Sequence, residues 1–188
     1  MHGILLVCEC KKYIYKDGRL AMEKNSCCSY CGSAFVKTDT WPKRCHACGT
    51  RSYLNPLPVV VVLLPVAAGL VVIRRNNEPQ KGTLALPGGY LDCGETWQEG
   101  ARRELLEETG IEIGSDDISL YDVQNGLDDT LVIFGLAEKK PISVLKLFYS
   151  METIEVVLIN RPVNLGFAMH TSVVQRYFSE AGVLLKAR

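Results

Sequence analysis

The most constraining feature of the sequence is the stretch 89–111, in which a glycine-containing loop leads into a segment with helical signals. Thr96 can cap the start of this helix, and Glu99, three residues later, can complete a capping box. Gly110 can end the helix, because glycine adopts a left-handed backbone without steric cost. Apolar residues recur at four-residue spacing, at Trp97, Ala101 and Leu105. The stretch therefore predicts a helix with one apolar stripe that faces a core.

The same helix carries three glutamates, Glu104, Glu107 and Glu108, at spacings that place them on one face. Carboxylates this close repel one another and raise one another's pKa unless positive charge neutralises them. Arg103 can reach Glu107 one turn along the helix and offset part of the charge. A Mg²⁺ or Mn²⁺ ion, which prefers oxygen ligands, would offset the rest. Taken alone, the three glutamates also fit a solvated acidic face, which is what most charge runs are.

Together, the loop and the helix match the 23-residue box of the Nudix hydrolases at every defined position. The matching residues are Gly89, Glu95, Arg103, Glu104, Leu105, Glu107, Glu108, Gly110 and Ile111. So many fixed positions are far more specific than a short glycine motif. The resemblance implies an α/β fold, the Nudix α/β/α sandwich with a mixed β-sheet between helices. It also implies an enzyme that hydrolyses the pyrophosphate bond of a nucleoside diphosphate linked to another group.

The resemblance also implies which residues hold the catalytic metal. Glu104 and Glu108 would be the core ligands of Mg²⁺ or Mn²⁺, and Glu107 would bind directly or through water. Because glycine allows close backbone approach, the carbonyl of Gly89 would complete the site.

Two further roles follow from the same resemblance. Arg103 and Glu95 would form a bridge that fixes the loop onto the helix. The family often adds one downstream acid as a ligand or a base, and the sequence does not choose among the candidates. These are Asp128, Asp129, Glu152 and Glu155.

A second motif precedes the box, in which Cys28 and Cys31 are followed by Cys45 and Cys48. Each Cys-x-x-Cys pair ends in glycine, which lets the backbone turn and point amides at the sulfurs. Four thiolates in this pattern are typical of structural Zn²⁺, whereas a disulfide pair or unrelated core thiols are the alternatives. Cys27 competes as a ligand, but the Cys28 register matches the second pair. A closed four-cysteine site has no open position and is therefore structural rather than catalytic.

A zinc ribbon directly ahead of a Nudix box is similar to the NADH pyrophosphatase branch and to related ADP-ribose and FAD pyrophosphatases. The NADH-specific branch carries a Ser-Gln-Pro-Trp-Pro-Phe-Pro motif after the box, and this sequence has none. The resemblance thus implies a small-molecule nucleotide substrate, with ADP-ribose first and FAD or NADH next. An RNA 5′-end or cap processing enzyme and a non-catalytic metabolite-sensing Nudix module remain as alternatives. The intact box argues against the sensor.

We therefore expect an N-terminal arm of unknown role (1–26), a zinc ribbon (27–55) and a Nudix domain (56–188). In the arm, Asp17-Gly18 favours a small hairpin, and no role is assigned to Cys8 and Cys10. Hydrophobic patterning predicts strands at 59–64, 70–75, 118–123, 130–137, 142–147 and 152–159, of which 142–147 could instead be a loop. Helical spacing predicts a closing helix over 166–181, with His170 in a structural role near its start.

Charge and composition limit the kinds of binding partner and the cellular setting that the sequence indicates. The formal net charge is zero, with nine Lys/Arg against four Asp/Glu in residues 1–58 and twelve against seventeen in the rest. This bias is too weak to indicate nucleic acid as a main partner. The apolar run 59–73 is too short to span a membrane and favours two buried strands. Without an export signal, eight cysteines indicate a cytoplasmic chain with reduced or metal-bound thiols. The ribbon is expected to stabilise the chain or to form a homodimer.

Overall fold

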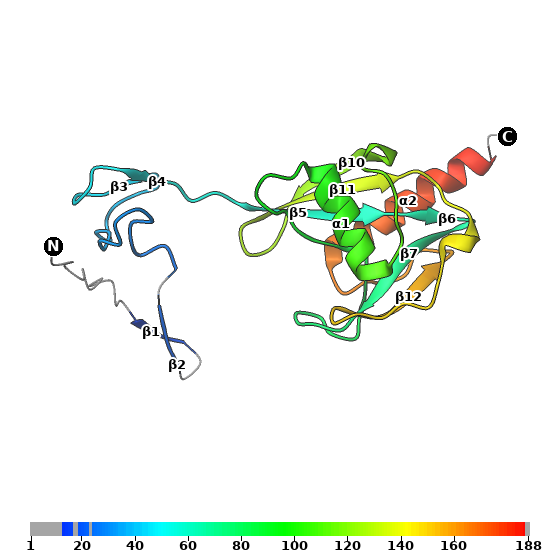
Figure 1. The fold of residues 1–188 in the computed structure, drawn as a ribbon, viewed down its shortest axis with the longest axis horizontal. Helices are drawn as coiled ribbons and strands as arrows, with labels where there is room; N and C mark the ends of the chain where they lie inside the picture. Colours follow the sequence, from blue (N-terminus) through cyan, green and yellow to red (C-terminus); the bar gives the residue numbers. More distant parts are fainter. Residues whose placement is uncertain (1–12, 17–18, 23, 187–188) are drawn as a thin grey trace, which may run out of the picture. The chain divides into compact units, whose positions relative to one another are not determined.

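The structure is a computed structural model that describes residues 13–16, 19–22 and 24–186. The described residues fall into two compact units that divide after Asn55 (Figure 1). The predictions for Cys8, Cys10 and the Asp17-Gly18 turn lie outside the described residues.

The N-terminal unit contains two small antiparallel pairs. Strand β1 (Tyr13–Lys16) pairs with β2 (Arg19–Met22), as the predicted hairpin requires. Strand β3 (Lys43–Arg44) pairs with β4 (Arg51–Ser52). Within residues 24–55, where burial is described, the apolar cluster consists of Cys28, Phe35 and Cys45, with Trp41 packed against it. A cluster this small is too little to hold a segment of that length without a covalent or metal staple.

The C-terminal unit is built from eight strands, two α-helices and two 3₁₀ turns. The strands are β5 (Leu57–Leu63), β6 (Pro65–Val66), β7 (Gly69–Arg75), β8 (Leu84–Ala85), β9 (Gly88–Tyr90), β10 (Ile118–Asn125), β11 (Thr130–Ala137) and β12 (Thr153–Ile159). The helices are α1 (Trp97–Thr109) and α2 (Ala168–Lys186), and the turns are η1 (Ser115–Asp117) and η2 (Ile142–Val144). One sheet has the order β10-β11-β5-β9, and the other the order β12-β7-β6, with β8 beside β7. Only β11 and β5 pair in parallel among these described strands, so the predicted mixed sheet is confirmed.

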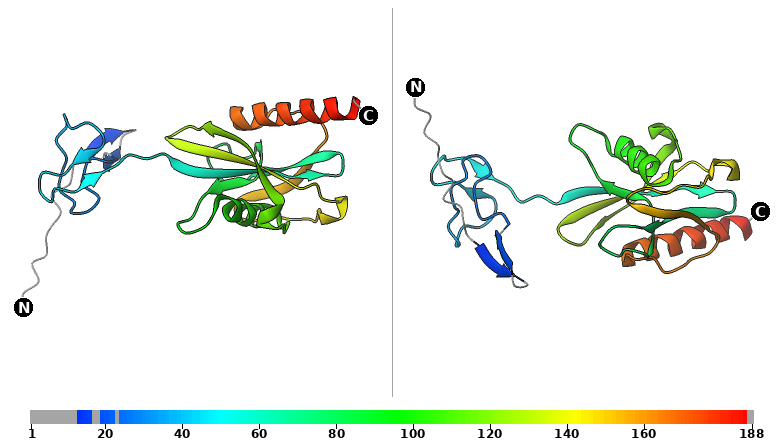
Figure 2. Two further views of the ribbon diagram at one scale, coloured as in Figure 1. Left: turned by 90° about the horizontal axis from the view of Figure 1, so that it is seen from above. Right: turned by 60° about the horizontal axis from the view of Figure 1, so that its bottom comes forward.

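Helices α1 and α2 lie on opposite faces of the strands, as the left view of Figure 2 shows. Side chains of strand β5 are buried on both faces of the sheet, towards α1 and towards α2. Val60 and Val62 are buried in a cluster with Leu105 of α1, whereas Val61 and Leu63 are buried in the cluster that receives α2. Because both sides of the strand are covered, its sequence is continuously apolar instead of alternating. The predicted α/β/α sandwich is therefore confirmed.

The apolar run 59–73 folds into β5, β6 and β7, so the prediction of buried strands is confirmed. Among the described residues, no helix combines the length and the apolar character needed to cross a bilayer.

The sequence allowed either a strand or a loop for the segment 142–147, and the structure shows that it is not a strand. It contains the single turn η2, followed by irregular chain up to β12. The reason lies in Val144 and Leu145, which are adjacent and both pack onto the α1-side core. Successive residues of a strand point to opposite faces, so a strand would not bury both on one side.

Candidate functional site

Helix α1 begins and ends as its sequence predicts. Glu99 N–H donates to the Thr96 hydroxyl at 3.3 Å, and the Glu99 carboxylate accepts from Thr96 N–H at 2.7 Å. Gly110 follows the helix with a left-handed φ of 68°. Ala101 and Leu105 are fully buried, with Trp97 packed against the same cluster. The caps fix where α1 begins and ends, and the buried stripe fixes which side of α1 faces the core. Together they determine the side of the helix on which its glutamates lie.

Strand β9 brings two glycines against those glutamates. The N–H of Gly88 donates to Glu108 Oε2 at 2.8 Å. A Cβ atom at Gly89 would lie 2.6 Å from the carboxylate carbon of Glu104, so any side chain here would displace that carboxylate. A Cβ atom at Gly88 would overlap the carbonyl of Val60 in the neighbouring strand β5. The glycine pair thus lets the backbone of β9 lie directly beside two carboxylates.

The three glutamates of α1 open into one cavity of about 180 Å³. Its lining residues are Glu104, Glu107, Glu108, Ser150, Met151 and Glu152. Glu104 and Glu108 are buried, at 9% and 2% exposure, whereas Glu107 is exposed. Three carboxylates of α1 and one from the segment before β12 therefore surround one small space.

Among the downstream acids, the cavity contains only Glu152. Glu155, three residues later, instead pairs with Arg74 at 2.7 Å on the adjacent strand. Asp128 and Asp129 lie with positive φ in the turn between β10 and β11 and do not line the cavity. Glu152 is held by Asn77, whose side-chain amide donates to Glu152 Oε2 at 3.2 Å.

Burial and mutual repulsion dominate the electrostatics of the cavity. Desolvation raises the pKa of Glu104, although its hydrogen bond with Arg103 opposes that shift. Desolvation also raises the pKa of Glu108 to about 8, against the hydrogen bond from Gly88 N–H and with added repulsion from Glu104 and Glu152. Carboxylates in such a setting gain by binding a cation, because the cation favours their ionised form.

Arg103 is the positive charge beside this cavity, and its guanidinium divides its contacts between the loop and the helix. It meets Glu95 at 2.7 Å and Glu104 at 2.7 Å, and it reaches Glu107 at 3.3 Å. It also donates to the carbonyl of Tyr90 at 2.9 Å. The hydrogen bond from Arg103 lowers the pKa of Glu95. The side chain therefore ties the loop 90–95 to α1, while two of the four cavity carboxylates, Glu108 and Glu152, lie outside its contacts.

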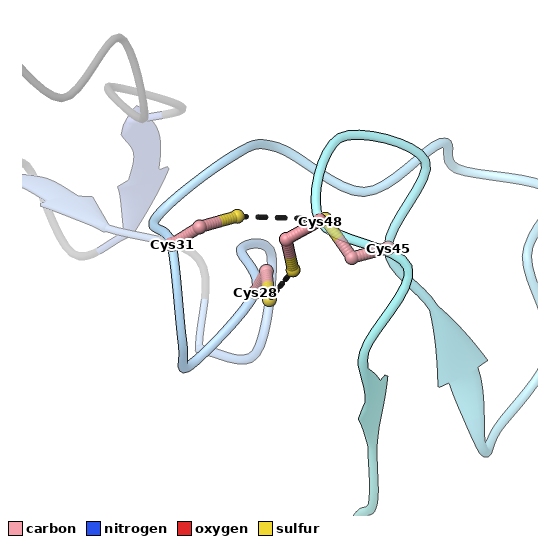
Figure 3. Close-up of side chains that lie close together, drawn as sticks. All are labelled: Cys28, Cys31, Cys45 and Cys48. Carbon is pink, nitrogen blue, oxygen red and sulfur yellow. Dashed lines mark hydrogen bonds between the residues drawn. The ribbon is translucent and has the colours of Figure 1, made fainter.

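In the N-terminal unit, the four predicted cysteines come together (Figure 3). Their sulfurs lie within 4.8 Å of one another, with Cys28 to Cys48 at 3.8 Å and Cys31 to Cys45 at 3.5 Å. Cys27 is not in this group and forms an isolated backbone bridge with Ala34. This sulfur spacing matches one tetrahedral thiolate site, for which Zn²⁺ is the usual ion.

Backbone turns and hydroxyls shape the cysteine cluster. The N–H groups of Gly32 and Gly49 donate to the carbonyls of Cys28 and Cys45, at 2.9 and 2.8 Å. Both glycines have positive φ, 75° and 76°, which side-chain-bearing residues rarely adopt. The pKa of Cys31 is lowered by the Ser33 hydroxyl, and that of Cys48 by the Thr50 hydroxyl. His46 lies outside the cluster and faces Asp39 at 3.7 Å.

The family profile described as "NUDIX domain" matches residues 55–152, just over half of the chain. The chain belongs to the Nudix family. The matched region contains the glycine pair, the whole of α1 and Glu152, so the cavity described above lies within the Nudix domain.

Relatives and solved structures agree with this assignment. The chain is similar to an "ADP-ribose pyrophosphatase" from Methanocaldococcus jannaschii, 44% identical over 61 residues, which is 32% of this chain and 36% of that protein. It is also similar to "NAD-capped RNA hydrolase NudC" from Citrobacter koseri, 28% identical over 87 residues, covering 46% and 34%. The alignments thus span about a third of these relatives' length. A NUDIX hydrolase structure from Nitrosomonas europaea aligns with a TM-score of 0.65 at 25% identity, covering 82% and 91%.

Two features of the cavity were not predicted from the sequence. Asn77 orients Glu152 from 75 residues away, and a lone asparagine carries no motif. Ser150 and Met151 line the cavity from a segment that the patterning left undecided. In both cases, the register that pairs β12 with β7, Thr153 opposite Arg75, brings the segments together.

Proposed function

We propose that this chain hydrolyses the pyrophosphate bond of a nucleoside diphosphate linked to another group, with ADP-ribose as the first candidate and FAD or NADH next. One observation carries the proposal: Glu104, Glu107, Glu108 and Glu152 line one cavity beside a glycine-bearing strand. A surface charge run would leave its carboxylates solvated, whereas Glu104 and Glu108 are buried. Burying two carboxyl groups costs free energy even though Glu104 meets Arg103, and that cost is accepted where a site uses them.

The donor set fits Mg²⁺ or Mn²⁺, because every candidate ligand is an oxygen. Glu104 and Glu108 would hold the metal, with Glu107 and the Gly89 carbonyl as further ligands. The bound ion would neutralise charge on the phosphates and make water a better nucleophile. Arg103 and Glu95 keep the loop in place during this chemistry. Glu152, on the far side of the cavity, is the downstream acid that we assign as an extra ligand or as the base.

ADP-ribose is the first candidate because the relative with 44% identity bears that activity in its name. The protein should be incubated with Mg²⁺ or Mn²⁺ and, separately, ADP-ribose, NADH, FAD, a nucleoside triphosphate and a capped RNA. The products would be identified by chromatography. AMP with ribose 5-phosphate from ADP-ribose would support the proposal. Turnover of none of these compounds with either metal would overturn it in favour of a metabolite sensor.

We also propose that residues 27–55 form a zinc ribbon ahead of a Nudix domain at 56–188. The four-sulfur cluster supports this division. Metal analysis of the purified chain should find about one zinc per chain, as a four-thiolate site requires. Cys31→Ser should lower that content, whereas Cys93→Ser, at an exposed cysteine outside the cluster, should leave it unchanged. A chain purified without zinc that also fails to take it up would contradict the proposal.

A capped RNA is the second candidate substrate, supported by a groove in the N-terminal unit. Three lysines, Lys24, Lys37 and Lys43, line it together with Phe35 and Trp41. Phosphate-binding lysines make activity depend steeply on salt. Hydrolysis of a capped RNA that falls steeply between 50 and 200 mM salt, while hydrolysis of ADP-ribose does not, would favour this candidate. Equal salt dependence of the two substrates would count against it.

A further inference from the structure

In the segment between η2 and β12, exposed and partly buried side chains alternate. Leu147, Tyr149 and Met151 are 106%, 84% and 90% exposed, which is extreme for large apolar residues. The two residues between them, Phe148 and Ser150, are partly buried. Exposed apolar residues scattered singly need no explanation, but three at alternate positions form a patch. We call Leu147, Tyr149 and Met151 the apolar strip.

The residues between the strip's members anchor the backbone. Phe148 packs against the end of α1, where a Cβ atom at Gly110 would lie 2.6 Å from the Phe148 ring. The Ser150 hydroxyl accepts the N–H groups of Glu152 and Thr153, at 3.2 and 3.1 Å. Ser150 N–H donates to the Thr153 carbonyl at 2.8 Å. The apolar strip is thus held outward by contacts on its opposite side.

The strip is continuous with the carboxylate cavity. Met151 lines that cavity together with Glu104, Glu108 and Glu152, and Tyr149 lies two residues earlier in the chain. A ligand that occupies both regions needs an anionic part that binds cations held by the glutamates. It also needs an apolar part directly beside the anionic one. A nucleotide has this construction, because a planar base lies one sugar away from its phosphates.

We propose that Tyr149 and Met151 form the surface on which the aromatic base of the substrate rests while its pyrophosphate occupies the carboxylate cavity. The proposal rests on the hydrolysis of nucleoside diphosphate compounds proposed above and names the part of the substrate that this chain selects. A tyrosine ring stacks on any planar base, and a methionine sulfur makes favourable contacts with aromatic rings. Substrates with a base are therefore preferred over pyrophosphate compounds without one.

The first test compares ADP-ribose with 5-phosphoribosyl 1-pyrophosphate, which has a pyrophosphate and a ribose but no base. Tyr149→Ala should raise the KM for ADP-ribose about 5- to 160-fold, the size of one lost base–aromatic stack, with kcat nearly unchanged. Met151→Ala should act in the same direction with a smaller effect, and Tyr149→Phe should restore the wild-type KM. Ile142→Ala, an exposed apolar residue outside the strip, is the matched control. Kinetics for the base-free compound should be the same in the wild type, in both Tyr149 variants and in Ile142→Ala.

A binding measurement separates this proposal from the proposed hydrolysis. The dissociation constant of ADP-ribose with Mg²⁺ is measured by calorimetry for the wild type and for Tyr149→Ala. Weaker binding to Tyr149→Ala would support the base surface even if the wild type turned nothing over. Equal binding would overturn it. If the variants bind equally and change the chain's mass in solution from dimer to monomer, the strip is an interface between copies and the proposal is wrong.

Discussion

The Nudix domain buries apolar side chains on both faces of its sheets, whereas the described part of the N-terminal unit buries little beyond two cysteines and a phenylalanine. The Nudix domain gains its stability from the apolar area that it removes from water. The N-terminal unit buries too little apolar area for this and brings four sulfurs together instead. The two units should therefore lose their structure under different treatments. It also explains why one unit is organised by hydrophobic patterning and the other by cysteine spacing.

The largest expected effect is the loss of the N-terminal unit when its metal is removed. Structural zinc in small domains contributes about 10–16 kcal/mol of apparent folding free energy, far more than this small core can replace. We expect a strong chelator, or Cys31→Ser, to open residues 24–55 to proteases. The Nudix domain should keep its thermal transition. Limited proteolysis with mass spectrometry, alongside circular dichroism, measures both units in one chain.

Cys93→Ser is the control, since Cys93 is exposed and lies outside the cluster. Cleavage within 24–55 that is equal with and without chelator would show that zinc does not hold this unit.

The reciprocal change targets the core of the Nudix domain. Leu105 is fully buried in the cluster between α1 and the strands. Leu105→Ala should lower the free energy of unfolding of the Nudix domain by about 2–5 kcal/mol, through lost burial and a residual cavity. Zinc content should not change, because the N-terminal unit has its own cluster. Leu106→Ala, at a half-exposed neighbour, should cost much less. Denaturant unfolding and metal analysis provide the measurements, and parallel loss of zinc would contradict the independence of the units.

Glu108→Gln should separate activity from stability within the Nudix domain. Turnover should fall by more than about 100-fold, since changing even an outer-shell partner of a metal costs about 10–100-fold. The fold should not weaken, because burial raises the pKa of Glu108 to about 8 and an amide removes the cost of ionising it. Steady-state kinetics and thermal unfolding in the presence of chelator measure the two effects. Glu112→Gln, at an exposed glutamate beyond the helix, is the control. Near-normal turnover by Glu108→Gln would refute the metal assignment.

The smallest effect that we expect is a loss of folding stability at low pH caused by His170. This histidine is buried and accepts the N–H of Leu86 at 3.2 Å through Nδ1, and burial lowers its pKa to about 3. The unfolded chain therefore binds the proton at higher pH than the folded chain, so stability falls as pH drops below about 6.5. Between pH 7 and 5, the loss due to His170 should be about 2 kcal/mol.

His170→Asn keeps a hydrogen-bond acceptor and removes the titration. Unfolding of the Nudix domain, measured across this pH range, should depend less on pH in the variant than in the wild type. Acid also releases zinc by protonating thiolates, and that part of the response should be the same in both proteins. Identical pH dependence of Nudix unfolding in the two proteins would contradict the buried neutral histidine.

Local signals predicted much of the fold and of the site. The caps at Thr96 and Gly110 and the apolar stripe placed α1 within its observed bounds, because these interactions span only a few residues. The strand 130–137 was predicted with its observed limits. The segment 142–147 stayed ambiguous, since its burial depends on where the α1-side core lies rather than on its own pattern.

Features whose interacting groups lie within one turn or one loop could be predicted from the sequence. These are the glutamate face of α1, the glycine pair beside it and the two cysteine pairs with their turning glycines. The distant residues that lie beside these features follow from strand register and packing. The register of β12 against β7 placed Glu152 in the cavity and Asn77 beside it, and it left Glu155 on Arg74. The anchoring of Phe148 at Gly110 likewise turned Tyr149 and Met151 outward. The pairing of β12 with β7 joins residues about 75 positions apart in the chain, and no local spacing carries a signal for it.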